Sequence, residues 1–251
     1  MRATAEVEAL VTEIDRELRS RGTPDRAERE KAYLKSDLEH YGTTVPDIRS
    51  VAKMITRRPP RLAHDELIAV VTELWATPVH ERRMAAVELL ELNVEVLRAR
   101  DMPMIERLLR ESRTWALVDS LSASVAGNLV DRFPELNAVL DRWAVDDDFW
   151  IRRSALLALL GGLRAGNGDF DRFARYADAM LEEKEFFIRK AIGWVLRDTA
   201  RKRPELVYDW LLPRAGRASG VTLREALKPL SEEQREAIRT RAKVSKVSKV
   251  H

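Results

Sequence analysis

An aromatic side chain and a carboxylate stand four residues apart in the segment RTWALVDSLS, residues 113–122. In a helix, this spacing places Trp115 and Asp119 on one face. The face of an indole attracts cations, and a fixed carboxylate stabilises positive charge that develops during a reaction. The pair therefore suits chemistry at a cationic centre. The alternatives are a tryptophan that fills the core and an aspartate that pairs with Arg113 or Arg153.

The helical segment that carries this pair is one of several similar segments along the chain. Strand signals are nearly absent, and six segments share one helical register, with first residues 34, 32, 38, 37 and 34 positions apart. The segments are RSVAKMI from Arg49, RMAAVEL from Arg83, WALVDSL from Trp115, RSALLAL from Arg153, KAIGWVL from Lys190 and REALKPL from Arg224. Positions two and six residues on are apolar in all six, which is typical of a buried helical stripe. The sequence predicts an all-α solenoid of about six HEAT-like repeats, curved with a basic concave face, in a single domain of residues 1–240.

The first position of the register is a cation in every segment but one. Equivalent positions of a solenoid line one surface, so these cations predict a basic stripe that can follow a phosphate backbone. Its members are Arg49, Arg83, Arg153, Lys190 and Arg224, reinforced by Lys53, Lys228, Arg152 and Arg197. The alternative is that these cations form ion pairs with the preceding repeat. Trp115 replaces the cation in the third segment, and Trp194 in the fifth corresponds to Asp119 in the third. Two indoles and a carboxylate at equivalent positions beside cations favour a binding or catalytic site.

Composition excludes several functions. The 251 residues include no cysteine and carry a net charge of +3, which rules out disulfides and a cysteine nucleophile and makes the cytoplasm the default expectation. The N-terminal residues lack an apolar signal core, and no stretch is long and apolar enough to span a membrane. The four histidines, His40, His64, His80 and His251, show no ligand-like spacing. We therefore expect them on the surface or at helix ends, and we expect neither a metal site nor a cofactor.

Two charged segments have structural interpretations. Asp146, Asp147 and Asp148 precede a helix that begins at Phe149, where acidic side chains cap the N-terminus and complement the helix dipole. Residues 241–251, RAKVSKVSKVH, carry lysines at every third position, namely Lys243, Lys246 and Lys249. We expect this segment to be a disordered basic tail that adds weak attraction for phosphate.

Four segments also resemble a known family. TWALVDSL, FWIRRSALLALL, EFFIRKAIGWVLRD and YLKSDLEHYGTTVPDIRSVAK are similar to segments of the AlkD-type DNA alkylation repair enzymes, which are bacterial DNA glycosylases built from HEAT-like repeats. The resemblance runs from about Tyr33 to about Lys228. It implies that Asp119 is the catalytic carboxylate and that Trp115 and Trp194 flank the nucleotide that carries the lesion. It also implies that Arg153, rather than Arg152, holds the DNA backbone beside the lesion.

The resemblance implies a monofunctional glycosylase that acts on double-stranded DNA with alkylated bases, as a monomer, on the nucleoid of a bacterial cytoplasm. A purine alkylated at N3 or N7, such as 3-methyladenine or 7-methylguanine, is cationic and can leave without a general acid, and the sugar then develops positive charge. A carboxylate and indoles are complementary to that charge. The family is understood to hold the lesion without flipping the base into a pocket. The alternative is a non-catalytic HEAT-like relative that binds DNA or serves as a protein scaffold.

Overall fold

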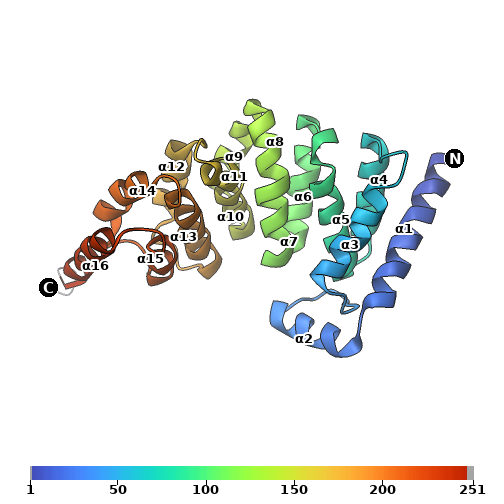
Figure 1. The fold of residues 1–251 in the computed structure, drawn as a ribbon, viewed down its shortest axis with the longest axis horizontal. Helices are drawn as coiled ribbons and strands as arrows, with labels where there is room; N and C mark the ends of the chain where they lie inside the picture. The colour runs from blue at the N-terminus through green and yellow to red at the C-terminus, as the bar shows by residue number, and fades with distance from the viewer. Residues whose placement is uncertain (1, 248–251) are drawn as a thin grey trace. The chain divides into compact units, whose positions relative to one another are not determined.

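The computed structural model describes residues 2–247, which are helices and short connections without a strand. The chain divides into two compact units, Met1–Leu121 and Ser122–His251. The first unit contains α1 (Arg2–Arg21), α2 (Pro24–Leu34), α3 (Val45–Thr56), α4 (His64–Ala76), α5 (His80–Leu92), α6 (Met102–Ser112) and α7 (Trp115–Ser120). The second contains α8 (Gly127–Arg132), α9 (Asn137–Trp143), α10 (Phe149–Leu157), α11 (Leu160–Ala165), α12 (Phe170–Met180), α13 (Phe186–Ala200), α14 (Pro204–Leu211), α15 (Gly220–Ala226) and α16 (Glu232–Val247) (Figure 1). A π-helical segment, Leu121–Ala126, follows α7.

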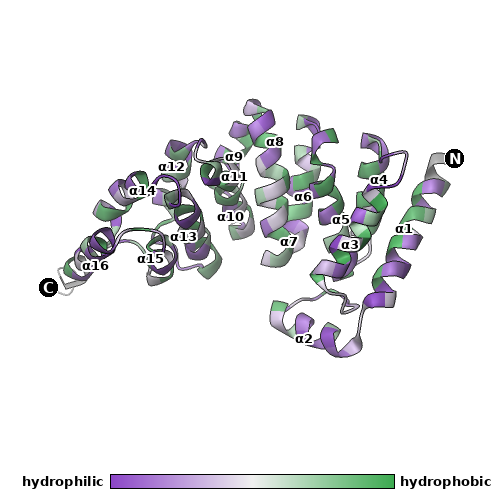
Figure 2. Ribbon diagram, in the orientation of Figure 1, coloured by the Kyte–Doolittle hydropathy of each residue, from purple (hydrophilic) through white to green (hydrophobic). Residues whose placement is uncertain are grey.

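The six register segments all lie on helices that stack on one another within their unit. In the first unit α3 packs against α5 and α5 against α7, and in the second α10 packs against α13 and α13 against α15. The residues two positions into each segment are buried, with exposures of 1% or less: Val51, Ala85, Leu117, Ala155, Ile192 and Ala226. Figure 2 shows polar and apolar stripes along single helices such as α1 and α13. The predicted all-α fold of HEAT-like repeats is confirmed.

A glycine sets the close approach of α13 to α15. A Cβ atom on Gly193 would lie 2.8 Å from Cβ of Glu225 and 2.9 Å from the carbonyl oxygen of Thr222. Both distances are shorter than side chains tolerate, so the backbones meet here only because this position has no side chain. The contact brings Glu225 of α15 against the face of α13 that carries Lys190 and Arg197.

The helix ends confirm one expectation from the sequence and correct another. The Asp148 side chain accepts a hydrogen bond of 2.9 Å from the backbone N–H of Trp150, which confirms the predicted cap of α10. Helix α16 continues past residue 240 to Val247, so residues 241–247, expected to be disordered, are helical. Lys249 and His251 lie outside the described residues. Among residues 2–247, no helix combines the length and the apolar character that a membrane span requires.

Candidate active site and cationic positions

The first unit presents Trp115 and Asp119 on α7. Thr114 precedes the helix in an extended conformation, so Trp115 is its first residue and Asp119 follows one turn later. The indole of Trp115 is 37% exposed, and Asp119 is half-buried. Trp115 therefore does not fill the core, in contrast to the fully buried Trp75 and Trp143. An indole and a carboxylate on one face of a helix, with the indole open to solvent, form the arrangement that the spacing predicts.

A tyrosine that the sequence did not single out completes an aromatic pair. Tyr33, at the end of α2, is 73% exposed and meets Trp115 edge to face, with ring centroids 6.2 Å apart and an angle of 88° between the planes. This geometry is favourable for two aromatic rings. The pairing joins residues 82 positions apart, and nothing in the local pattern around Tyr33 indicates it.

The helix changes type directly after Asp119 and Ser120. Residues Leu121–Ala126 form a π-helical segment before α8 begins at Gly127. Such segments are rare and are frequent at functional sites. The sequence predicts a helix here but not the change to a π-helix, because the pattern of apolar residues does not reveal one extra residue in a helical turn.

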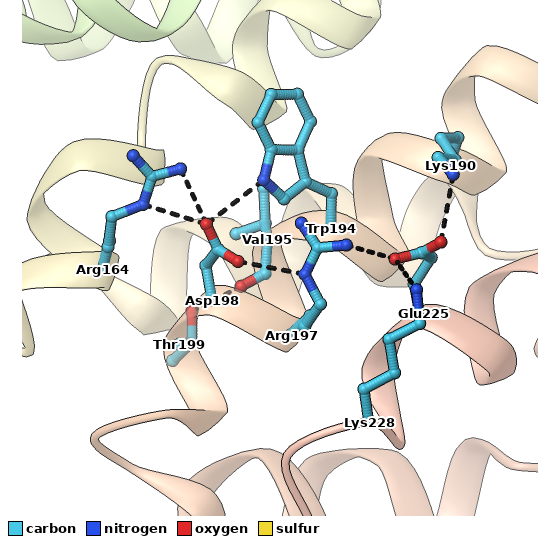
Figure 3. Close-up of polar contacts among 9 residues, drawn as sticks. All are labelled: Arg164, Lys190, Trp194, Val195, Arg197, Asp198, Thr199, Glu225 and Lys228. Carbon is cyan, nitrogen blue, oxygen red and sulfur yellow. Dashed lines mark hydrogen bonds and ion pairs between the residues drawn. The ribbon is translucent and has the colours of Figure 1, made fainter.

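The second unit holds Trp194 through a buried carboxylate. Trp194 Nε1 donates a hydrogen bond of 3.2 Å to Asp198 Oδ2, one turn further along α13. The same oxygen accepts from Arg164 Nε and Nη2 at 2.9 and 2.7 Å, and Oδ1 accepts from Arg197 Nε at 3.1 Å (Figure 3). Burial raises the pKa of Asp198, but the hydrogen bonds from Arg164 and Arg197 lower it by more, so the carboxylate is ionised. The indole is thus fixed by a charged group that is 3% exposed.

A second carboxylate in this unit collects three cations. Glu225 accepts from Lys190 Nζ at 3.0 Å, from Lys228 Nζ at 2.9 Å and from Arg197, which thereby bridges Glu225 and Asp198 (Figure 3). Burial raises the pKa of Glu225, but the lysines and Arg197 bring it down to about 2. Lys190, Lys228 and Arg197 therefore belong to an internal charge network, although the two lysine side chains remain 43% and 56% exposed.

The cations at the first register position link one repeat to the next. Arg49 forms two hydrogen bonds of 2.9 Å with Glu88 of α5, and Lys190 of α13 pairs with Glu225 of α15. Arg83 donates to the carbonyl oxygen of Glu111 at 3.0 Å, and Arg153 donates to that of Phe187. The observation favours contacts between repeats over a stripe of open cations. The partner lies in the following repeat, not in the preceding one.

The remaining predicted phosphate contacts differ in accessibility. Arg153 is 2% exposed. Its neighbour Arg152 pairs with Glu183 at 2.8 Å and donates to the carbonyl oxygens of Asp146 and Asp147. The side chains of Lys53 and Arg224 make no hydrogen bond or ion pair with any residue from 2 to 247. Arg224 is exposed and Lys53 is half-exposed, so these two cations are the ones that can meet a phosphate without breaking a contact.

The expectation of surface or helix-end histidines is only partly correct. His64 begins α4, and its ring nitrogens contact Asp65 and Asp101 at 2.7 and 2.8 Å. His80 begins α5 but is 2% exposed, and the side chain of His40 is 1% exposed. The expectation of a surface position is wrong for both, because the fold packs their rings against each other with centroids 4.5 Å apart.

The chain is an all-α repeat protein, with an exposed indole and a half-buried carboxylate on one of its helices. The family model described as "DNA alkylation repair enzyme" matches residues 14–230. The chain belongs to the DNA alkylation repair enzyme family. The resemblance seen in the sequence is thereby confirmed at the level of the family.

Two solved structures show the same fold. A protein from Enterococcus faecalis described as a predicted DNA alkylation repair enzyme is 22% identical, with a TM-score of 0.74, over 84% of this chain and 98% of that one. AlkD2 from Streptococcus mutans is 16% identical, with a TM-score of 0.52, over 90% of this chain and 99% of that one. No curated protein matches the chain.

Proposed function

We propose that the protein is a monofunctional DNA glycosylase that hydrolyses the N-glycosidic bond of cationic alkylated purines, 3-methyladenine and 7-methylguanine, in base excision repair. The observation that carries the proposal is the solvent-open Trp115 one turn before Asp119 on α7, in a chain of the DNA alkylation repair enzyme family. Its substrate is double-stranded DNA. In this proposal the lesion is held by its backbone and the base is not flipped into a pocket.

The proposed chemistry assigns a part to each side chain. Asp119 stabilises the positive charge that develops on the sugar as the base leaves, and orients the attacking water. Stabilisation of this kind typically contributes about 2.7 to 4 kcal/mol, or roughly 100- to 1000-fold in rate. Trp115 and Trp194 supply indole faces that attract a cationic base or sugar, on the order of 0.5 to 2 kcal/mol each. A cationic purine is a good leaving group, so no general acid is required.

DNA contacts are proposed for the cations of the register. Lys53 and Arg224 support this best, since neither is occupied by another residue from 2 to 247. Arg49 and Lys190 keep side chains 47% and 43% exposed beside their carboxylate partners and can add to the attraction for phosphate. Arg153 remains a proposed contact through the family resemblance, and Arg83, Arg152 and Arg197 remain proposed contacts because the register places them in or beside the basic stripe. We further propose that the protein acts as a monomer on the bacterial nucleoid in the cytoplasm.

The test is release of methylated bases from alkylated duplex DNA. Asp119→Asn removes the charge at nearly constant volume, and we expect base release to fall roughly 100- to 1000-fold while DNA binding is retained. Asp65→Asn is the matched control: Asp65 is a fully exposed carboxylate of the same unit, and its loss should leave base release unchanged. Undiminished release by Asp119→Asn contradicts the proposal.

The pairing of register cations with the following repeat favours a second candidate, a non-catalytic HEAT-like relative that binds DNA or partner proteins. The links of Arg49, Arg83, Arg153 and Lys190 show that a cation at this position has a structural use without DNA. This candidate predicts no base release by the wild-type protein from any alkylated duplex. The same assay therefore separates the two functions.

A further inference from the structure

Three side chains that commonly bind metal ions come together in the first unit, on elements other than α7. Glu30 lies on α2, His40 in the connection after it, and His80 at the start of α5. One potential ligand atom from each side chain lies within 4.8 Å of the others. The three are separated by 10 and 40 residues in the sequence, so their meeting depends on the tertiary fold.

Backbone contacts hold the two histidines in place. Glu39 and Val79 form an isolated parallel bridge, in which the Glu39 N–H donates to Pro78 at 3.0 Å and the His80 N–H donates to the Glu39 carbonyl at 2.9 Å. Because the bridge pairs residue 39 with residue 79, the next residues, His40 and His80, lie side by side. Their rings are nearly parallel, at 8°.

A buried carboxylate secures the same connection. Glu81, which is 0% exposed, accepts hydrogen bonds from the backbone N–H groups of Tyr41, Gly42 and Thr43 at 2.9, 2.6 and 3.2 Å. The segment that carries His40 is thus tied to the first turn of α5 on both sides of the imidazole. A site built on it has a fixed backbone.

The polar atoms of this cluster lack partners. Glu30 Oε2, His40 Nδ1, His40 Nε2 and His80 Nδ1 are buried and form no hydrogen bond with any residue from 2 to 247. His40 Nδ1 and Glu30 Oε2 are 3.7 Å apart, which is too long for a hydrogen bond. Buried polar groups are nearly always satisfied, so four unsatisfied atoms at one point require an explanation.

The atoms without partners are of the kinds that bind transition metal ions. His40 and His80 offer imidazole nitrogens, which are common ligands of zinc. Arg26 donates to Glu30 Oε1 at 3.0 Å and leaves Oε2 facing the imidazoles. One carboxylate oxygen and two imidazole nitrogens form the ligand set of many zinc sites, in which water supplies the fourth ligand.

We propose that Glu30, His40 and His80 bind a divalent transition metal ion, with zinc as the best match to these ligands. In a tetrahedral zinc site two ligand atoms are about 3.4 Å apart, because each bond is about 2.0 to 2.1 Å long. The ligand atoms, now within 4.8 Å of one another, would have to approach by up to about 1.4 Å as the stacked rings turn toward the ion.

The ion would anchor α2. This helix fully buries none of its residues, so apolar packing contributes little to holding it against α5. A bond from Glu30 through the ion to His80 joins the two helices directly. Helix α2 also carries Tyr33, which contacts Trp115. The ion would therefore join α2 to α5 and fix one side of the aromatic pair.

The test uses the untagged full-length protein, treated with chelator and titrated with zinc ions. We expect saturable uptake of one equivalent, and a rise in melting temperature of roughly 5 to 10 °C at free zinc 100-fold above Kd. Cobalt ions in place of zinc should give the visible absorption of a tetrahedral site. This spectrum needs no variant, so it tests the proposal even if substitutions in the cluster impair folding.

Two variants assign the ligands. Glu30→Gln keeps the shape and the contact with Arg26 but removes the charge, and it should lose zinc uptake and the thermal shift while the circular dichroism stays unchanged. His64→Gln is the matched control, because His64 is the other described histidine of this unit and contacts two carboxylates. It should bind zinc as the wild type does. No saturable uptake by the wild type, uptake retained in Glu30→Gln, or uptake lost in His64→Gln would each overturn the proposal.

Discussion

Replacing Asp198 by asparagine tests how the second unit positions Trp194. The carboxylate accepts four hydrogen bonds, two from Arg164 and one each from Arg197 and Trp194. The amide keeps the size of the side chain but removes the charge and places an NH2 group against N–H donors. At least one of the arginine contacts must then break, and the indole loses the charged acceptor that fixes its plane.

The size of the effect follows from burial. Breaking a buried ion pair costs about 3 to 5 kcal/mol, whereas an exposed pair is worth about 0 to 1 kcal/mol. The side chain of Asp198 is 4% exposed, but those of Arg164 and Arg197 are 53% and 23% exposed and regain water. We therefore expect a loss of about 2 kcal/mol in the free energy of unfolding, or a melting temperature lower by roughly 4 to 8 °C.

Base release should fall as well, because Trp194 is no longer held. The loss is bounded by the attraction of one indole for a cation, about 0.5 to 2 kcal/mol, which corresponds to roughly 2- to 30-fold in rate. Asp178→Asn is the matched control. Asp178 pairs with Arg214 and Arg217 in the same unit, makes no hydrogen bond with a tryptophan among residues 2–247, and has a side chain that is 35% exposed. It should lower stability by about 1 kcal/mol or less and leave base release unchanged.

A double-mutant cycle decides whether Asp198 acts through the indole. In a Trp194→Phe background, Asp198→Asn should still lower the melting temperature but cause no further loss of base release. Base release that is unchanged in the single Asp198→Asn variant would refute the positioning role. So would an equal fall in Asp178→Asn, which would attribute the effect to lost stability.

Three further predictions concern packing, pH and DNA contacts. Gly193→Ala should destabilise the second unit by about 1 to 3 kcal/mol in denaturant unfolding, because its Cβ would lie 2.9 Å from the Thr222 carbonyl oxygen; an unchanged midpoint would contradict the close packing. The pKa of Glu225 is lowered to about 2, so its contribution is complete above its unfolded pKa near 4.5 and disappears as the pH falls through 2. Glu225→Gln should therefore cost about 1 to 2 kcal/mol at pH 7 and nothing below pH 2, and a loss independent of pH would contradict the charge network. Lys53→Ala and Arg224→Ala should each weaken DNA binding and reduce the slope of log K against log salt by about 1, and an unchanged slope would exclude that phosphate contact.

The repeats could be predicted because they depend on local periodicity. Each buried stripe recurs at nearly constant spacing, and the residues at its second position, such as Leu117 and Ile192, are fully buried. The cap at Asp148 was equally local, since a capping side chain acts within three residues. The position of Trp115 and Asp119 on one helix face could also be predicted, because it follows from their spacing of four residues in a helix.

Contacts between distant residues could not be read in the same way. The link from Arg49 to Glu88 spans 39 residues, and sequence alone left it undecided whether such cations meet phosphate or carboxylate. The contact of Tyr33 with Trp115 and the burial of His40 against His80 likewise depend on where connections cross the helices. Two backbone hydrogen bonds at Glu39 fix the position of His40. Backbone hydrogen bonds do not depend on side-chain type, so the sequence does not indicate them.

Trp115 is the one residue at the first register position that is not a cation, and the other five positions show what it replaces. Four of the five cations at the first position reach the following repeat, through a carboxylate or a backbone carbonyl. Trp115 has a single N–H and no charge, so it cannot form such an ion pair. The boundary between the two compact units follows at Leu121, where the π-helical segment begins. At this register position, four repeats form a contact with the following repeat, whereas the third repeat exposes an indole. The third repeat therefore lacks a stabilising contact that the others have, as is common at functional sites. The substitution Trp115→Arg restores the residue type of the other repeats, and it should therefore leave the stability equal or higher while base release is lost.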